Sequence, residues 1–243
     1  MLDLLRHCDA SLEARDCVGG CGGDPVTGNI RQFDIRAFKD EKEDWRRDLP
    51  PWTLALAVEC KNIRPHYPLL LSAVPRTTEE AFHDLLVLDG KTYYPHTRIQ
   101  RVKGSVYKEG EMVAKQTDQV HWKNENLESD DEATFGKIRQ ALNSCEGLVR
   151  NFATKLTPPD TRMILPLLVV PSGTLWQVDF TEAGELQTPP RLIESSTLFL
   201  NHGWTVNREP TVGPITYQVS HLELVSQDAL PKAAERWKNF FVE

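Results

Sequence analysis

The segment from Trp52 to Val58 is almost continuously apolar, and the chain turns abruptly polar after it, in the order Glu-Cys-Lys-Asn. A run of this length, rich in leucine and alanine and preceded by Pro50 and Pro51, is typical of a central strand that is buried on both faces. Such a strand needs hydrogen-bonded neighbours along its edges and packed layers on its faces. The segment therefore predicts a sheet of several strands that is covered by helices.

The periodicity of apolar residues predicts the other elements. Strands are expected at residues 30–38, 68–74, 162–170, 174–180 and 215–225, and helices at residues 78–88, 129–156 and 227–241. Ser129 and Glu132 would form a capping box at the start of the long helix. The strands at 162–170 and 174–180 are expected to form a hairpin, with the first arm near the sheet edge because Pro166 lacks an N–H group. The expected fold class is α/β, a mixed central β-sheet flanked by helices, with additional C-terminal β-strands.

Length and composition indicate a globular chain. With 243 residues, of which 40% are hydrophobic and 26% charged, the chain can bury one sizeable core. We expect a single domain over residues 1–243, with a core over about 1–160 and a β-rich C-terminal elaboration over about 161–243. No apolar run approaches the roughly 18 to 20 residues that cross a bilayer, and the first residues lack the pattern of a secretory signal. A cytoplasmic protein without a membrane contact is the expectation.

Basic residues gather in one segment, although the formal net charge of the chain is −7. Residues 91–115 contain six basic and two acidic residues, a local balance of +4, interleaved with tyrosines. Such a segment can contact a phosphate backbone while aromatic rings stack on bases. The candidate nucleic-acid contacts are Lys91, Arg98, Arg101 and Lys103. A solvated loop whose tyrosines face the core explains the same pattern.

Charged residues also stand where strands should be buried. Glu59 and Lys61 are two residues apart, so on a strand they lie on one side, together with Ala55 and Ala57. Asp34 interrupts the preceding strand between two apolar residues. If the two strands pair antiparallel, the three charged groups can converge. Burying such charges costs several kcal/mol unless a partner or a metal compensates.

Two carboxylates and an ammonium group suit phosphodiester hydrolysis. Hard oxygen ligands favour Mg²⁺, which keeps bound waters and can also take a substrate phosphate. The metal lowers the pKa of a bound water, while a lysine can orient that water and offset the developing negative charge. The three residues therefore predict a metal-dependent phosphodiesterase site that needs neither cysteine nor histidine.

At these residues the chain resembles the PD-(D/E)xK, or restriction-endonuclease-like, nuclease superfamily. The match covers residues 28–62, with Asp34 in one strand and Glu59, Cys60 and Lys61 at the end of the next. The resemblance implies that Asp34, Glu59 and the backbone carbonyl of Cys60 bind Mg²⁺ or Mn²⁺, and that Lys61 is the catalytic lysine. It also implies a restriction-endonuclease-like core and a nucleic-acid substrate, with DNA favoured over RNA. The oligomeric state stays open, with a homodimer as one option.

Some features differ from the family pattern. Many members carry a further acid on a helix ahead of the first strand, and only Glu13 or Asp3 could supply it here. The connection between Asp34 and Glu59 is also long and highly charged. A fold can tolerate such an insertion at its surface, because a longer loop costs little additional free energy. Family members often place a polar helix residue near the metal, and Gln140 could take that place.

Two interpretations compete with an active nuclease. Glu59 and Lys61 could be a structural ion pair at a strand end, with Asp34 bonded to Arg31 or Arg36. Alternatively, a nuclease-like fold could have lost catalysis and act as a nucleic-acid- or protein-binding module. Binding of Mg²⁺ would separate these interpretations from the active enzyme.

The cysteines allow one further interpretation, a zinc-stabilised interaction domain that uses Cys8, Cys17 and Cys21. Their spacing is not that of a Cys-x-x-Cys knuckle, and no histidine pair follows at ligand spacing. An odd number of five cysteines also argues against a disulfide framework. We therefore expect reduced cysteines.

Overall fold

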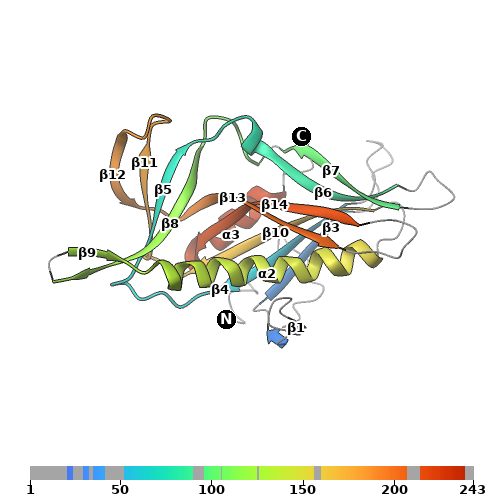
Figure 1. The fold of residues 1–243 in the computed structure, drawn as a ribbon, viewed down its shortest axis with the longest axis horizontal. Coiled ribbons are helices and arrows are strands. Elements are labelled where there is room, and N and C mark those ends of the chain that lie inside the picture. Colours follow the sequence, from blue (N-terminus) through green and yellow to red (C-terminus); the bar gives the residue numbers. More distant parts are fainter. Residues whose placement is uncertain are drawn as a thin grey trace.

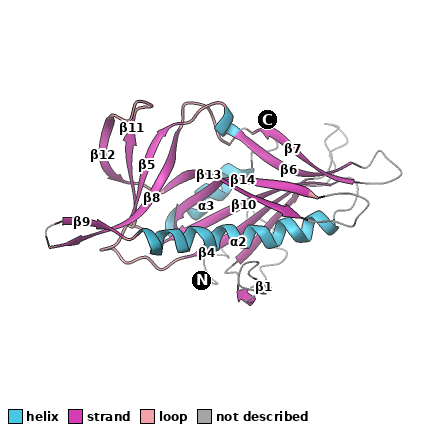
Figure 2. Ribbon diagram, in the orientation of Figure 1, coloured by secondary structure: helices cyan, strands magenta, loops and turns pink. Residues whose placement is uncertain are grey.

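The structure, a computed structural model, describes residues 21–23, 30–32, 35–41, 52–89, 96–104, 106–124, 126–155, 160–206 and 214–238. These residues form a mixed sheet of twelve strands, two α-helices and a separate pair of short strands, β1 (Cys21–Gly23) and β2 (Ile30–Gln32). Figure 2 shows how far strand predominates over helix. Within the described ranges, no helix is both long and apolar enough to cross a membrane.

The apolar segment forms β4 (Trp52–Cys60), which lies between two other strands. β3 (Ile35–Glu41) pairs antiparallel with one edge of β4, and β10 (Asp160–Val170) pairs parallel with the other. Every residue from Trp52 to Glu59 is buried. The prediction of a central strand buried on both faces is confirmed.

Beyond β10, the sheet continues through strands that are not neighbours in the sequence. β14 (Ile215–Ser226) pairs parallel with β10, and β13 (Ser195–Val206) pairs antiparallel with β14. Then follow, in order, β8 (Met112–Lys123), β5 (Leu69–Pro75), β11 (Leu175–Phe180) and β12 (Leu186–Leu192). Off this path, β6 (Phe82–Asp89) pairs with β10 and β7 (His96–Lys103), and β9 (Asn126–Ser129) pairs with β8. Strands from before and after residue 160 therefore share one sheet (Figure 1).

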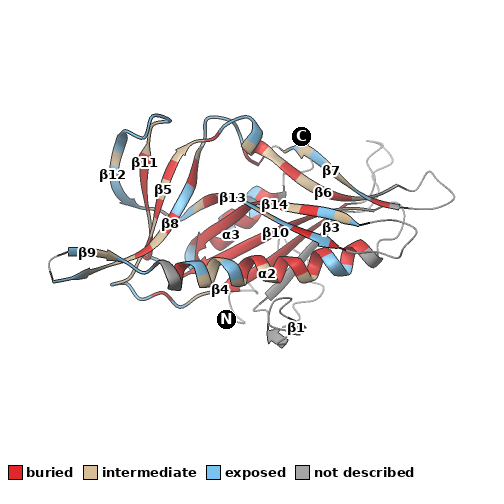
Figure 3. Ribbon diagram, in the orientation of Figure 1, coloured by how far each residue is buried: buried red, intermediate tan, exposed pale blue. Residues whose placement is uncertain are grey.

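Two helices cover opposite faces of the central strands. α2 (Asp131–Lys155) packs on the face that carries Ala55 and Ala57, where the small side chains leave room for the helix. α3 (Leu230–Lys238) follows the 3₁₀ turn η2 (Gln227–Ala229) and packs on the face of Leu54 and Leu56. Figure 3 shows that the buried residues concentrate on the strands between the two helices. In coarse outline the chain is α/β, as expected, but mostly sheet.

The predicted helix at residues 78–88 is wrong. One 3₁₀ turn, η1 (Glu79–Ala81), is followed by the strand β6. In β6, Leu86 pairs with Arg162 of β10 on one edge and with Ile99 of β7 on the other. The spacing of the apolar residues suits a helix as well as a strand that is half buried, so the pattern alone is ambiguous. Residues 82–89 form a strand because their backbone pairs with both β7 and β10.

The predicted hairpin of residues 162–180 is also wrong, because β10 is a central strand and β11 pairs with β5 and β12. One edge of β10 pairs with β4, whereas the other edge pairs with β6 at residues 160–162 and with β14 at residues 167–170. The Ile164 N–H points to that second edge, where it donates to the Tyr217 hydroxyl. Backbone groups alternate between edges, so the nitrogen of Pro166 faces the same interval between β6 and β14. A proline is tolerated there because neither β6 nor β14 pairs with that edge of β10 at residue 166.

Other expected elements are confirmed with shifted bounds, namely β5, β14, α2 and the pair η2 and α3. The strand expected at residues 30–38 is divided into β2 and β3. Ser129 is not the helix cap, because it belongs to β9 and α2 begins at Asp131. The Asp130 carbonyl instead accepts the first helical hydrogen bond, from the Thr134 N–H.

Candidate functional site

Glu59 and Lys61 lie at the carboxyl end of β4. Glu59 is opposite Leu168 of β10 and shares the α2-covered face with Ala55 and Ala57. The Lys61 Nζ donates a hydrogen bond to the Glu59 Oε1, so the two charges form an ion pair. The side chain of Glu59 is 10% exposed and that of Lys61 21% exposed. The carboxylate is therefore shielded by protein but is not sealed off from solvent.

Asp34 lies outside the described residues, so its side chain is not placed. The next residue in the chain, Ile35, begins β3 and pairs with Val58, the residue before Glu59. The antiparallel pairing that the sequence analysis required between the two strands is present. β3 therefore begins, one residue after Asp34, at the end of β4 that carries Glu59.

Lys137 of α2 is a residue that the sequence analysis missed. Its Nζ donates to the Gln119 Oε1 at 2.7 Å, and Gln119 is a buried residue of β8. Burial lowers the pKa of the Lys137 ammonium; nearby Asp130 opposes this shift and Lys61 adds to it. The charge of Lys61 thus acts on Lys137 although the two residues are 76 positions apart in the chain. No local pattern in the sequence could reveal this proximity. Gln140 lies three residues after Lys137 on α2 and is partly exposed.

The oxygen atoms at this end of β4 are of the kind that Mg²⁺ and Mn²⁺ prefer. Glu59 supplies a carboxylate, and Cys60 supplies a backbone carbonyl next to it. Among the described residues, no group of three or more His, Cys, Asp or Glu side chains is arranged to hold a metal. Asp34 would have to supply the second carboxylate, and Lys61 would have to release Glu59. The Glu59 carboxylate and the Cys60 carbonyl are therefore suitable ligand types for a hard divalent cation. A complete metal site would also require the carboxylate of Asp34.

Arg98, one of the basic residues expected to contact nucleic acid, lies far from Glu59 along the sheet. Arg98 of β7 is opposite Val87 of β6, which is opposite Thr161 of β10. Thr161 precedes Leu168, the partner of Glu59, by seven residues, or roughly 23 Å along the strand. Arg98, Arg101 and Lys103 are all exposed, and strand alternation puts Arg98 on one face and the other two on the opposite face.

Several candidate residues lie outside the described part of the chain. They include one basic residue and the acids and cysteines of the N-terminal segment, namely Lys91, Asp3, Glu13, Cys8 and Cys17. Cys21 begins β1, and its side chain is not placed. The zinc alternative and the additional helix acid therefore stay predictions.

Comparisons of the chain with family models, with curated proteins and with solved structures found no match. The chemistry and placement of the site residues thus have to carry any functional proposal.

A second set of buried charges lies between β14 and α3. Glu223 of β14 is fully buried and accepts hydrogen bonds from the Tyr107 hydroxyl, the Thr197 hydroxyl at 3.0 Å and the Arg236 guanidinium. Arg236 comes from α3, so the ion pair joins the helix to the sheet. In the sequence, Glu223 carries the same signal as Glu59, a carboxylate within an apolar strand. The Glu223 carboxylate accepts hydrogen bonds from three side chains of the protein itself, which indicates a structural role.

Aromatic and imidazole rings stack beside this ion pair. The rings of Tyr107 and His221 are 4.1 Å apart, and His83 stacks on Tyr107 at 4.6 Å. The Arg76 guanidinium lies over the Tyr107 ring, with Nη1 2.8 Å from the His221 Nε2. Burial lowers the pKa of His83 to about 3 and that of His221 well below its usual value, and Arg76 adds to both shifts. Both imidazoles are therefore neutral at physiological pH.

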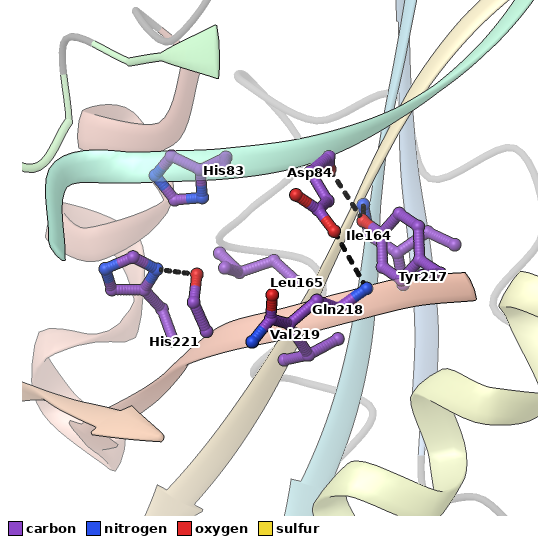
Figure 4. A pocket seen from close by; sticks show the side chains of 9 residues that line it. His83, Asp84, Ile164, Leu165, Tyr217, Gln218, Val219 and His221 are labelled. Atoms are coloured by element: carbon purple, nitrogen blue, oxygen red, sulfur yellow. Dashed lines mark hydrogen bonds between the residues drawn. The ribbon is translucent and has the colours of Figure 1, made fainter. Parts of the chain in front are cut away.

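A pocket of about 210 Å³, including its open mouth, adjoins these rings (Figure 4). It lies where β6 and β14 meet β10. The Tyr217 hydroxyl donates to the Asp84 carbonyl at 2.9 Å and accepts from the Ile164 N–H, while the Gln218 N–H donates to the Asp84 Oδ2. Burial raises the pKa of Asp84, and the Gln218 hydrogen bond opposes the shift. The polar groups around the pocket thus join three strands.

Proposed function

We propose that this chain is a metal-dependent nuclease that hydrolyses phosphodiester bonds, with DNA as its substrate. The observation that carries the proposal is the position of Glu59 and Lys61 together at the end of a buried central strand. A neighbouring strand begins one residue after Asp34 at the same end of β4. In this proposal, β3, β4 and β10 with α2 form the restriction-endonuclease-like core.

The proposed chemistry assigns one role to each residue. Asp34, Glu59 and the Cys60 carbonyl would hold Mg²⁺ or Mn²⁺, which activates a bound water and polarises the phosphate. Lys61 would leave Glu59 when the cation binds and would then donate hydrogen bonds to the attacking water. Its positive charge also offsets the charge that develops on the phosphate. The low exposure of Glu59 keeps bulk water away and so strengthens these interactions.

Incubation of plasmid and single-stranded DNA with Mg²⁺ or Mn²⁺ tests the proposal. We expect cleavage by the wild-type protein, and a loss of rate of about 10² to 10⁴ in Lys61→Ala, the range for a group that assists proton transfer. Glu59→Gln should lose activity as well, because a neutral amide is a poor ligand for Mg²⁺. The rates are measured on gels with labelled substrate.

Arg191→Ala is the matched control. The guanidinium of Arg191 pairs at 2.8 Å with Asp179, another buried carboxylate, in β11. Removing Arg191 therefore takes a paired cation from a buried carboxylate, as Lys61→Ala does, but away from β4. A loss of activity in both variants would indicate misfolding rather than catalysis. The proposal fails if the wild-type protein cleaves neither substrate, or if Lys61→Ala cleaves normally.

The direct ion pair of Glu59 and Lys61 favours one alternative function, a nuclease-like fold without catalysis that binds nucleic acid or protein. In such a protein Lys61 neutralises Glu59 permanently, and no cation has to bind. Calorimetric titration with Mg²⁺ separates the two functions. The nuclease should bind Mg²⁺, and Glu59→Gln should abolish that binding, whereas the binding module should give no heat in either form.

A further inference from the structure

Lys137 brings a second ammonium group to the part of the molecule that carries Glu59 and Lys61. α2 covers the face of β4 that carries Glu59, and its Ala141, four residues after Lys137, packs in one cluster with Leu168, the residue opposite Glu59. The charge of Lys61, at the end of β4, also acts on Lys137. Like charges that are partly withdrawn from water repel each other, and nearby Asp130 offsets part of this repulsion at Lys137. An anion bound next to both ammonium groups would offset that repulsion.

Gln119 links Lys137 to the loop that follows Lys61 through hydrogen bonds. Its side-chain carbonyl accepts from the Lys137 Nζ at 2.7 Å, and its side-chain amide donates to the Tyr67 carbonyl at 2.9 Å. Tyr67 belongs to the loop that begins at Lys61 and leads to β5. One buried side chain therefore connects α2 to the loop of the proposed catalytic lysine.

The backbone of Gln119 also fixes the first turn of α2. Its N–H donates to the Thr134 hydroxyl at 2.7 Å, and its carbonyl accepts from the Asp130 N–H at 2.7 Å. Figure 1 shows β9 leading from the end of β8 into the start of the helix. The first turns of α2, which carry Lys137, are thus attached to the sheet. A cation in such a position is preorganised, because little side-chain and backbone entropy remains to be lost on binding.

We propose that Lys137 binds a backbone phosphate of the nucleic acid, next to the phosphate that is cleaved at Glu59 and Lys61. This inference rests on the proposed function. A nucleic-acid strand carries phosphates at regular intervals, so a second cation beside the catalytic lysine can hold a neighbouring one. Lysine suits this role as a point charge that donates to phosphate oxygens. The contact positions the strand and reads no base.

The charge distribution supports a local contact of this kind. The chain has a formal net charge of −7, so its overall field repels a polyanion. Arg98 of the basic strand β7 cannot offset this at the site, because it lies roughly 23 Å along the sheet from the level of Glu59. A cation on another element therefore has to take the place of Arg98 beside the scissile phosphate, and α2 supplies Lys137.

Cleavage kinetics and DNA binding of three variants test the assignment. Lys137→Ala should raise KM about tenfold and leave kcat within about twofold, because a charged hydrogen bond to substrate is lost while the reacting groups stay. In fluorescence anisotropy without metal, the slope of log affinity against log salt should fall by about one. Lys137→Arg should restore both KM and the salt slope.

Arg139→Ala is the control. Arg139 is an exposed cation on the same helix, and its guanidinium lies over the Phe135 ring.

The outcomes separate this inference from the proposed nuclease. If the wild-type protein cleaves DNA and Lys137→Ala matches Arg139→Ala in KM and salt slope, the role of Lys137 is overturned and the nuclease stands. If nothing is cleaved but Lys137→Ala alone weakens DNA binding, the nuclease is overturned and the phosphate contact is supported. Absence of both cleavage and binding overturns both proposals.

Discussion

Glu59 and Glu223 are both carboxylates within apolar strands, yet their surroundings differ. Glu223 is fully buried, and Tyr107, Thr197 and Arg236 all donate to it. Glu59 lies at a strand end, where its partner Lys61 is partly exposed. A fully buried charge with several donors is stable in place, whereas a carboxylate at a strand end, paired with a partly exposed ammonium, can exchange that ammonium for a cation. The surroundings, rather than the residue type, make Glu59 the functional candidate.

The histidines in the ring stack should make the protein sensitive to mild acid. Burial lowers the pKa values of His83 and His221, that of His83 to about 3. Below about pH 6.5 these two histidines are therefore protonated in the unfolded chain but stay neutral in the folded chain. The free energy of unfolding should therefore fall as the pH falls below 6.5, by up to about 1.4 kcal/mol per pH unit for each histidine. Urea unfolding between pH 7 and pH 5 measures this slope.

Two variants locate the source of that slope. His221→Gln should reduce it by about half, because one of the two buried imidazoles is removed. His66→Gln should leave it unchanged, because His66 lies exposed in the loop after β4. A stability that stays flat from pH 7 to pH 5 in the wild-type protein would contradict the prediction.

At the scale of elements, the junction of β6, β10 and β14 shows how one side chain can replace a missing strand pairing. β10 loses its β6 partner after residue 162 and gains β14 at residue 167. The Tyr217 hydroxyl fills part of this interval by accepting from the Ile164 N–H and donating to the Asp84 carbonyl. Both backbone groups would otherwise be buried without those partners, which costs more than the hydrogen bonds contribute.

Tyr217→Phe tests this junction. The change removes a hydroxyl from a side chain that is 1% exposed and leaves the Ile164 N–H and the Asp84 carbonyl without that partner. We expect the free energy of unfolding to fall by about 1 to 3 kcal/mol. Urea unfolding gives the value. Tyr67→Phe is the control, because the described residues offer the Tyr67 hydroxyl no hydrogen bond, and its effect should be below about 0.5 kcal/mol. Equal effects of the two changes would refute the role given to Tyr217.

At the scale of the whole molecule, the candidate site is assembled from segments that are far apart in the chain. β3 and β4 supply the strand ends, β8 supplies Gln119 and α2 supplies Lys137. These elements meet only when the sheet and its covering helix are formed. A ligand of the site therefore binds the folded chain and not the unfolded one, so binding must raise the stability of the entire fold.

Mg²⁺ should accordingly raise the thermal midpoint of the wild-type protein. The expected stabilisation is about 2.7 kcal/mol when the concentration of Mg²⁺ is a hundred times its Kd. Glu59→Gln should abolish the shift, because it removes a carboxylate ligand. Asp179→Asn should keep it, because Asp179 is a buried carboxylate that pairs with Arg191 elsewhere in the sheet. Differential scanning fluorimetry measures the midpoints, and equal shifts in the two variants would argue against a metal site at Glu59.

The amino-acid sequence by itself determined β4, β14 and α2, because their length and period leave one structure that buries their apolar residues. It also marked Glu59 and Lys61, since an apolar strand that ends in charges is a local pattern. Only the tertiary structure decided that residues 82–89 form a strand, that β10 is central and that α2, which carries Lys137, covers the face of β4 that carries Glu59. Each of these depends on hydrogen bonds or packing with residues tens of positions away, and a local pattern contains no information about which distant segment will lie alongside.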